Sequence, residues 1–303
     1  MRVVFVEQPS NLPPPPEGRV AVVDVAFAGA DAYDRSTVPF LEALGDRLAV
    51  WIDHHEHPLG WSRVRGDARF LLVPNREAHA CPELVTPEVV ARAGKVDVVV
   101  AHADLDGLLS AVKFLRGGVA PWPEADEDAR AADSPGRGHA LSERARLLSD
   151  ALDGAASELR TAEREELRQQ IVLALVQAPA AMPQILEARL RQLQQIQLKS
   201  LEPVDALAAQ AREEAGGVLV VRAEKALPRS VKKALLSRLE ARAVVGVVVE
   251  GKAITCATFR EEVDLARVPA LSAGRSDYRF AQVTDAGRAI VQELGELVRD
   301  ASA

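Results

Sequence analysis

The first third of the chain alternates short apolar runs with amphipathic segments. Runs rich in Val, Ile and Leu predict strands of a parallel sheet, because such strands are covered on both faces. Amphipathic segments between them are typical of the crossover helices that join parallel strands. The predicted fold class is therefore α/β, a mostly parallel sheet flanked by helices. The predicted strands are residues 2–6, 19–25, 48–52, 70–73 and 96–102.

Helical spacing predicts crossover helices at residues 37–44 and 105–118. Residues 119–139 are polar and rich in Pro, Asp and Gly, which predicts a loop. From residue 141 to about residue 212, apolar side chains recur every three or four positions, and Pro179 and Pro183 interrupt the pattern. This stretch predicts a helical middle segment.

Strand signals return after Gly216 and predict a second, smaller α/β domain. Its predicted strands include residues 218–223, 243–251 and 253–259, with a hairpin turn at Gly251-Lys252. The two predicted domains are residues 1–205, which include the helical connector, and residues 206–303.

Composition narrows the class of protein. The chain has 303 residues and a formal net charge of -7, which argues against broad electrostatic capture of duplex nucleic acid. Cys81 and Cys256 are too few for a disulfide framework. No run reaches the ~18 apolar residues of a membrane span, and the first apolar stretch is too short for a signal peptide. We therefore expect a cytoplasmic protein with no membrane partner.

A metal-binding pattern ends the fifth apolar run. His102, Asp104 and Asp106 alternate in the segment AHADLDG, so in an extended chain all three side chains point to one side. Gly107 lets the backbone turn closely into the next helix, whose N-terminal dipole favours a nearby anion. Asp is also a favoured N-cap residue, so a capped strand end remains the alternative for each carboxylate.

A second pattern, Asp53-His54-His55, ends the third run. Adjacent histidines point to opposite sides of an extended chain, so one can bind a metal while the other faces a substrate. Asp53 is interpreted as the group that orients the ligating histidines. Taken by itself, this triplet is also compatible with a surface loop.

Asp24 ends the second run at the corresponding position. In the company of the other two motifs it is a candidate bridging carboxylate for two divalent cations about 3.5–4 Å apart, which activate water for in-line displacement at phosphorus. Carboxylates combined with imidazoles suit Mn²⁺ or Mg²⁺.

Together these motifs resemble those of the DHH phosphoesterase superfamily, which includes RecJ-like exonucleases and small-oligoribonucleotide nucleases. The triplet that names the family is present, HxDxDG is similar to its first motif, and VVDVA around Asp24 is similar to its second. The family order has HxDxDG first, whereas here it comes last. This order resembles a circular permutation, which a site built from strand ends tolerates.

The resemblance implies a role for each residue. His55 would contact the scissile phosphate or help the leaving group, and Asp53 would orient the histidines. Asp133 would be the last metal ligand, with a turn or helix-start residue as the alternative. Mn²⁺ is the first choice of cation and Mg²⁺ the second. The implied ligands are His102 and Asp104 for one metal, His54, Asp106 and Asp133 for the other, and Asp24 for both.

The C-terminal residues resemble more faintly the DHH-associated substrate-binding domain. That domain carries a Gly-rich GGGH loop, of which the histidine is missing here and the glycines are fewer. The planar guanidinium of arginine forms bidentate hydrogen bonds with phosphate, although exposed arginines are also common on solvated faces. The candidate substrate contacts are Arg260, Gly274, Arg275, Ser276 and Arg279.

The predicted function is a metal-dependent phosphoesterase that hydrolyses small nucleotides or short single-stranded oligonucleotides, with water activated by two metals in a cleft between the two domains. Duplex nucleic acid is not expected as a partner, and a homodimer is left open. The alternative is a catalytically weak nucleotide sensor that retains the metal site. A third interpretation is an interaction scaffold built on the helical middle segment, which predicts no bound metal.

Overall fold

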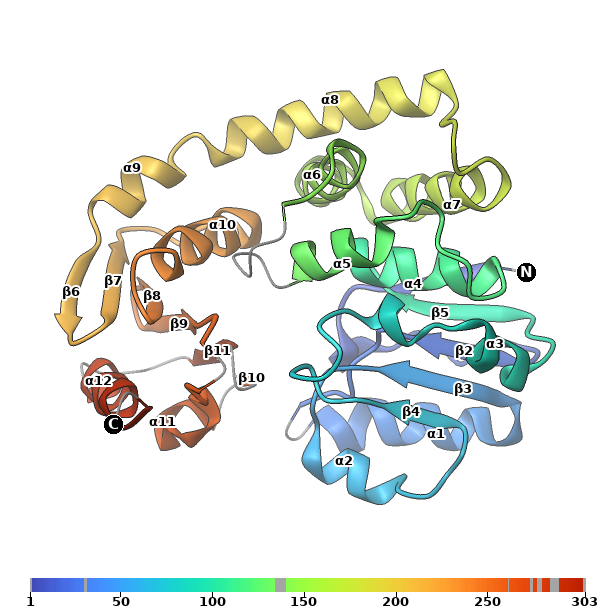
Figure 1. Cartoon of the computed structure of the whole chain (residues 1–303), viewed down its shortest axis with the longest axis horizontal. Helices are drawn as coiled ribbons and strands as arrows, with labels where there is room; N and C mark the ends of the chain where they lie inside the picture. Colours follow the sequence, from blue (N-terminus) through green and yellow to red (C-terminus); the bar gives the residue numbers. More distant parts are fainter. Residues whose placement is uncertain are drawn as a thin grey trace. The chain divides into compact units, whose positions relative to one another are not determined.

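The chain divides into two compact units, Met1–Gln197 and Leu198–Ala303, in a computed structural model (Figure 1). Each unit contains a sheet with helices packed on it, so the predicted α/β class is confirmed. The unit boundary lies inside a helix, whereas the sequence predicts the boundary at residues 205 and 206. The structure describes residues 2–29, 32–133, 140–260, 262–272, 275–276, 280–283 and 289–301.

A five-stranded sheet forms the centre of the first unit. All its strand pairs are parallel, and the strand order is β1-β5-β2-β3-β4. Each strand that the apolar runs predict is present. The strands are β1 (Arg2–Val6), β2 (Val20–Val23), β3 (Leu48–Asp53), β4 (Phe70–Leu72) and β5 (Val98–His102).

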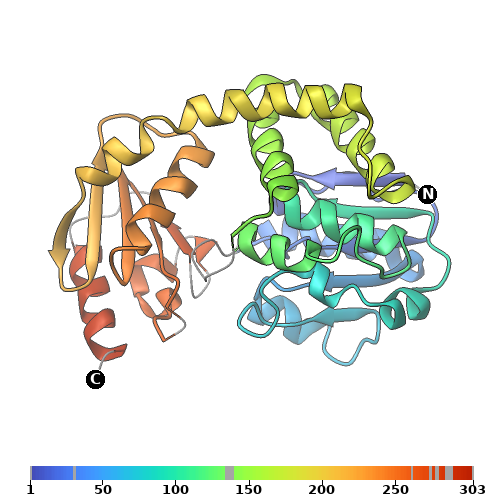
Figure 2. The same ribbon diagram turned by 45° about the horizontal axis from the view of Figure 1, so that its top comes forward.

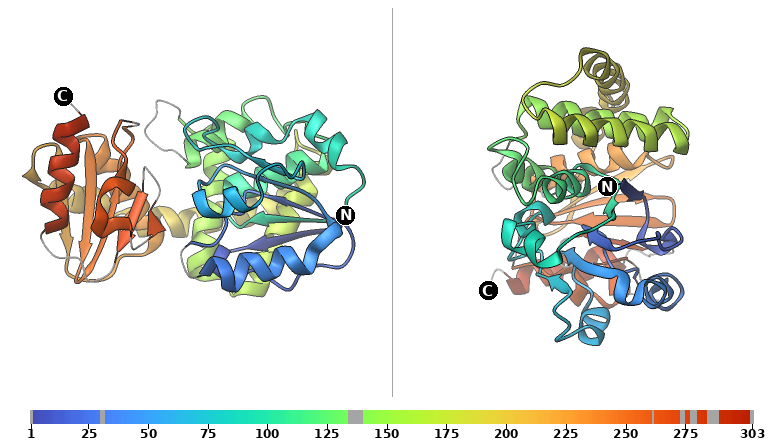
Figure 3. Two further views of the ribbon diagram at one scale, coloured as in Figure 1. Left: turned by 90° about the horizontal axis from the view of Figure 1, so that it is seen from below. Right: turned by 90° about the vertical axis from the view of Figure 1, so that its right-hand side faces the viewer.

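Helices cover both faces of this sheet, which Figure 3 shows from two further directions. Alternate residues of the strands enter different cores: Val23 packs with the helices from α3 onward, and Val22 packs with α1 and α2. All four residues of β2 are fully buried, as expected for a central parallel strand. The helices are α1 (Val38–Leu44), α2 (Pro58–Arg63), α3 (Pro87–Ala93), α4 (Leu105–Leu115), α5 (Ala125–Asp133), α6 (Glu143–Glu158), α7 (Thr161–Gln177) and α8 (Gln184–Leu201).

The loop predicted over residues 119–139 is wrong in part, because Ala125–Asp133 forms α5. Alanine is the strongest helix former, and Ala125 and Ala129 are buried against the core. Asp128 is also buried and accepts hydrogen bonds from the Trp122 indole (2.8 Å) and from the backbone and hydroxyl of Ser142 (2.6 and 2.7 Å). These tertiary contacts favour a helix where the composition alone indicates a loop.

The second unit has a six-stranded sheet of order β10-β11-β9-β8-β7-β6, in which only the β7–β8 pair is parallel among the described strands. The predicted hairpin is confirmed, since Glu250 pairs with Ala253 across the turn at Gly251-Lys252. The sequence does not predict β6, because its polar residues REEA give no strand signal. The strands are β6 (Arg212–Ala215), β7 (Val218–Ala223), β8 (Val245–Glu250), β9 (Ala253–Ala257), β10 (Arg275–Ser276) and β11 (Phe280–Val283).

Helices pack on both faces of the second sheet as well. Figure 2 shows α10 (Arg229–Glu240) and α12 (Ala289–Ala301) on opposite faces. α9 (Val204–Ala209) packs in the same core as α10, and α11 (Pro269–Ser272) packs in the same core as α12. Over the described parts of the whole chain, no helix combines the length and the apolar character needed to cross a membrane.

Candidate metal centre

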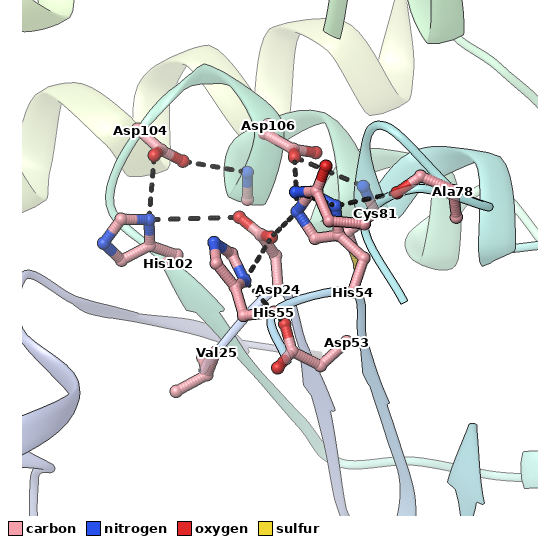
Figure 4. Close-up of polar contacts among 12 residues, drawn as sticks. Asp24, Val25, Asp53, His54, His55, Ala78, Cys81, His102, Asp104 and Asp106 are labelled. Carbon is pink, nitrogen blue, oxygen red and sulfur yellow. Dashed lines mark hydrogen bonds and ion pairs between the residues drawn. The ribbon is translucent and has the colours of Figure 1, made fainter. Parts of the chain in front are cut away.

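Three strand ends bring the sequence motifs together at one edge of the first sheet (Figure 4). β2 lies between β5 and β3, and Val23 is in register with Ala101 on one side and with Ile52 on the other. The next residues along these parallel strands are Asp24, His102 and Asp53, which therefore lie at the same level.

The strand order also reverses at this position. From β2 the chain adds β3 and β4 on one side, and β5 then lies on the other side of β2. Open α/β sheets bind ligands at such a switch point, outside the carboxyl ends of the strands. The topology thus places the motifs where a parallel sheet is suited to hold a ligand.

Asp24 lies at the centre of the site. Its Oδ1 is 3.4 Å from His54 Nε2 and 3.9 Å from His55 Nδ1, and its Oδ2 is 3.9 Å from His102 Nδ1. The side chain is 1% exposed. Its backbone φ is 58°, and among the described residues no other non-glycine has a positive φ. This conformation costs of order 1–3 kcal/mol and is typical of functional positions.

His102 and Asp104 form one side of the site. His102 Nδ1 is 2.8 Å from Asp104 Oδ2, while Asp104 Oδ1 accepts a hydrogen bond from the Gly107 amide (3.1 Å). Asp104 is thus the N-cap of α4 and also faces the site, so the two interpretations of this carboxylate are compatible. The expectation of three side chains on one side of an extended strand is wrong, because α4 begins at Leu105 and turns Asp106 toward His54.

His54, Asp106 and Asp133 form the other side. His54 is fully buried, and its Nε2 lies 3.4 Å from Asp106 Oδ2 as well as from Asp24. Asp133 is the last residue of α5, so it is neither a turn residue nor at a helix start. Its carboxylate, the His54 ring and the Asp106 carboxylate offer ligand atoms within 4.8 Å of one another.

His54 and His55 have different environments, as the sequence predicts for adjacent residues. The His55 side chain is 32% exposed, and its Nδ1 lies 2.8 Å from Oδ1 of the buried Asp53. Burial would lower the pKa of His55, but the Asp53 carboxylate raises this pKa to about 9. Asp53 therefore orients His55, whereas His54 is oriented by other groups.

The donor atoms fit divalent cations. Ligands of one cation at ~2.0–2.6 Å must lie within ~5 Å of each other, and three groups here offer ligand atoms within 4.8 Å. Buried polar atoms normally have hydrogen-bond partners. Several buried atoms at this site make no hydrogen bond among the described residues, namely Asp24 Oδ1 and Oδ2, Asp53 Oδ2, His54 Nε2 and Asp106 Oδ1. The groups are Asp24, His54 and His55; Asp24, His102 and Asp104; and His54, Asp106 and Asp133.

Burial and the neighbouring charges together set the pKa values at the site. Burial raises the pKa of Asp24 to about 6, although His54 counteracts this rise. Burial and the nearby Asp24 charge raise the pKa of Asp106 well above its usual range. Burial would lower the pKa values of His54 and His102, but the neighbouring carboxylates raise both. Carboxylates thus outweigh cationic groups, an imbalance that a bound divalent cation relieves.

Sequence reasoning missed the groups that support His54 and Asp106. His54 Nδ1 lies 3.0 Å from the carbonyl of Ala78 and 3.3 Å from the amide nitrogen of Asn75. Cys81 donates its backbone N–H to Asp106 Oδ2 (3.2 Å). The Ala78 carbonyl accepts a hydrogen bond from Nδ1–H, which leaves Nε2 as the nitrogen that faces the two carboxylates. Only Asn75 contributes a side chain, and nothing in its sequence context marks it.

The predicted substrate contacts all belong to the second unit. Arg260 is exposed in the segment after β9, where its backbone N–H donates to the Thr258 hydroxyl (3.0 Å). Arg275 and Ser276 form β10. Gly274 and Arg279 lie outside the described residues. These assignments therefore stay predictions.

Gly107 is a position where a small change should disturb the site strongly. A Cβ atom added there would lie 2.3 Å from the carbonyl oxygen of His102, which is backbone and cannot easily move. We expect Gly107→Ala to separate His102 from Asp104 and to weaken Mn²⁺ binding at least ~10-fold, as supporting contacts of metal ligands typically do. Isothermal titration calorimetry measures this change.

The matched control for Gly107→Ala is Gly216→Ala. An added Cβ at Gly216 has no atom within 4 Å, and the backbone φ there is not positive. Its Mn²⁺ affinity should equal that of the wild type. Equal affinities for all three proteins would contradict the role given to the Gly107 turn.

Comparison with solved structures gives distant matches. No family model matches the chain, and no curated protein matches it. A solved structure of exonuclease RecJ bound to manganese is 17% identical and has a TM-score of 0.45, with 93% of this chain and 75% of RecJ covered. A pGpG-specific phosphodiesterase, PggH from Vibrio cholerae, is 10% identical with a TM-score of 0.46, covering 94% of this chain and 99% of PggH.

An exopolyphosphatase-related protein from Bacteroides fragilis is 11% identical, with a TM-score of 0.41 and coverage of 94% of this chain and 71% of that protein. All three are members of the DHH superfamily, the one that the motifs resemble. The geometry of the site, rather than these distant likenesses, carries the functional proposal.

Proposed function

We propose that this chain is a DHH-type, metal-dependent phosphoesterase that hydrolyses small nucleotides or short single-stranded oligonucleotides. The observation that carries the proposal is the position of Asp24. It directly follows the central strand β2 and contacts His54 on one side (3.4 Å) and His102 on the other (3.9 Å). One buried carboxylate thus lies between two sets of candidate ligands, which supports a two-metal site.

Two divalent cations fit these two sets. His102 and Asp104 would hold the first, and Asp24 would be common to both. His54, Asp106 and Asp133 would hold the second. When bound, such cations activate water and offset negative charge on phosphoryl oxygens. Imidazoles combined with carboxylates favour Mn²⁺, with Mg²⁺ as the alternative.

The remaining residues act on the substrate. His55 is partly exposed and is held by Asp53, so its ring can contact the scissile phosphate or the leaving group from a fixed position. The N-terminus of α4 lies directly after Asp104 and favours the phosphate electrostatically. Both groups position the anion and hold it next to the ligand sets.

The second unit is proposed to bind the rest of the substrate. Arg260, Arg275, Ser276 and Arg279 are the candidate contacts, with Gly274 in the loop that replaces GGGH. The net charge of -7 favours small substrates, since positive charge is then needed only inside the site. A cytoplasmic location and a circularly permuted motif order belong to the same proposal.

A turnover assay tests this function. Purified protein with Mn²⁺ is incubated with a panel of dinucleotides and with pyrophosphate, beside a His54→Ala control. Because His54 joins Asp24 to Asp106, the control should lose at least ~10³-fold of the wild-type rate, equivalent to ~4 kcal/mol of transition-state stabilisation. Release of product by the wild type alone would support the hydrolase.

The sensor is the second candidate, and the incomplete Gly-rich loop favours it. Tight nucleotide binding with no product above the His54→Ala control would favour the sensor over the hydrolase. Purified protein that binds no divalent cation would exclude both and favour a scaffold.

A further inference from the structure

The segment between β4 and α3 contacts the elements that carry one set of the proposed metal ligands. We propose that residues 75–84, called here the bracing segment, position His54, Asp106 and Asp133, and so control the affinity for one of the two cations. The inference rests on the proposed function and deepens it. It names positioning residues, which act through the ligands and not on the substrate.

The bracing segment orients His54 and Asp106 directly (Figure 4). The Ala78 carbonyl and the Asn75 side chain both reach His54 Nδ1, at 3.0 and 3.3 Å. The Cys81 N–H donates to Asp106 Oδ2 at 3.2 Å. Asn75 is only 5% exposed, so its amide is held inside the protein beside the imidazole. A ligating histidine needs an acceptor on its other nitrogen to fix its tautomer, and the Ala78 carbonyl is that acceptor, while the Asn75 amide packs beside the ring.

The same segment also holds α5, which carries Asp133. The Glu83 carboxylate accepts two hydrogen bonds from the Arg130 guanidinium, from Nε at 3.1 Å and from Nη2 at 2.9 Å. Arg130 precedes Asp133 by three residues, and residues at this spacing lie on the same side of a helix. The paired hydrogen bonds fix direction as well as distance. The Glu83–Arg130 pair therefore sets where the end of α5 lies.

A contact to α4 completes the arrangement. Lys113 is buried on α4, and its Nζ donates to the Pro82 carbonyl (2.8 Å) and is paired with Asp126 on α5. The segment thus joins the end of β3, the start of α4 and the end of α5. His102 and Asp104 are oriented by each other and by the Gly107 amide. The two cations should therefore depend differently on the bracing segment.

Calorimetric titration of the full chain with MnCl₂ tests the inference. The wild type should show two binding events. Asn75→Ala and Glu83→Gln should each weaken one event by ~10–100-fold, the usual effect of supporting partners on metal affinity, and leave the other unchanged. Arg76→Ala and Glu77→Ala are the controls, because both residues are exposed in the same segment, and neither should change either event.

Two backgrounds identify the affected cation. In His102→Ala, the remaining event belongs to the His54 side, and Asn75→Ala should weaken it further. In Asp106→Asn, the remaining event belongs to the His102 side, and Asn75→Ala should leave it unchanged. The charge swap Glu83→Arg with Arg130→Glu should restore the affinity that Glu83→Arg alone removes. This rescue separates a positioning role from a loss of folding.

Each outcome bears on one claim. If the wild type shows two binding events and Asn75→Ala, Glu83→Gln and Glu83→Arg all leave both unchanged, the positioning role of the bracing segment is wrong. The proposed function is then unaffected. Equal weakening of both events by Asn75→Ala would also overturn it. A wild type that binds no Mn²⁺ would defeat the proposed function itself. If Asn75→Ala does not fold, judged by circular dichroism, Glu83→Gln carries the test, since Glu83 lies nearer the surface.

Discussion

Asp24→Asn is expected to lower kcat/KM by at least ~10³-fold and, at the same time, to stabilise the metal-free protein. The loss of activity follows because both ligand sets share this carboxylate, and ~4 kcal/mol of transition-state stabilisation corresponds to that factor. Asn keeps the shape of the side chain. It also tolerates a φ of 58° better than most residues, so the backbone should not change.

The gain in stability has a separate cause. Both oxygens of Asp24 are buried without a hydrogen bond among the described residues. Leaving a buried polar group unsatisfied costs about 1–3 kcal/mol, and more when the group is charged. Burial raises the pKa of Asp24 to about 6, so the folded state disfavours its charged form, and removing the charge should raise the free energy of unfolding by ~1–3 kcal/mol near neutral pH in the presence of a chelator. Urea unfolding with and without Mn²⁺ measures both states.

Asp46→Asn is the matched control, since Asp46 is an exposed carboxylate of the same unit. It should change neither turnover nor stability. Mn²⁺ should stabilise the wild type and this control, but not Asp24→Asn. An Asp24→Asn protein that is both active and stabilised by Mn²⁺ would contradict the proposal that Asp24 binds both cations.

His55→Ala is expected to separate catalysis from metal binding. Turnover should fall by ~10²–10⁴-fold, the usual range for a side chain that moves or holds a proton during reaction. Mn²⁺ affinity should stay close to that of the wild type, because the ligand sets on both sides of Asp24 remain complete. Parallel calorimetry and turnover measurements on one preparation test both parts.

Asp53→Asn provides a graded comparison. Asn can still contact His55 Nδ1 at this position, but it lacks the charge that raises the pKa of His55 to about 9. Its loss of turnover should therefore be smaller than that of His55→Ala. His55 also lies within ligand distance of Asp24 and His54. Loss of a Mn²⁺ binding event in His55→Ala would show that His55 is a ligand instead.

The strands that carry the site were predictable because their signals are local. An apolar run followed by polar residues, as at residues 48–55 and 98–106, marks both a buried strand and its carboxyl end. Parallel strands expose these ends at one edge, so the convergence of Asp24, His54 and His102 also follows from the fold class.

The strand order and α5 were not predictable in the same way. Periodicity gives no information on neighbours, so nothing in the sequence shows that β5 lies between β1 and β2. The Pro, Asp and Gly content of residues 119–139 indicates a loop, but it hides the alanines of α5, whose helix is also held by the buried Asp128 through hydrogen bonds from Trp122 and Ser142. The sequence therefore predicts Asp133 as a metal ligand but not the helix that carries it.

The supporting groups of the site were also beyond sequence reasoning. The Ala78 carbonyl and the Cys81 amide act through backbone atoms, which every non-proline residue possesses. Only the three-dimensional arrangement shows which backbone atoms meet His54 and Asp106. This is why candidate ligands can be named from the sequence but the bracing segment cannot.

Anomalous diffraction from a crystal soaked in MnCl₂ tests the central claim most directly. The account predicts two manganese peaks, both bound to Asp24, one also bound to His102 and the other to His54. Manganese bound elsewhere on the protein, with Asp24 and both histidines free of metal, would contradict it.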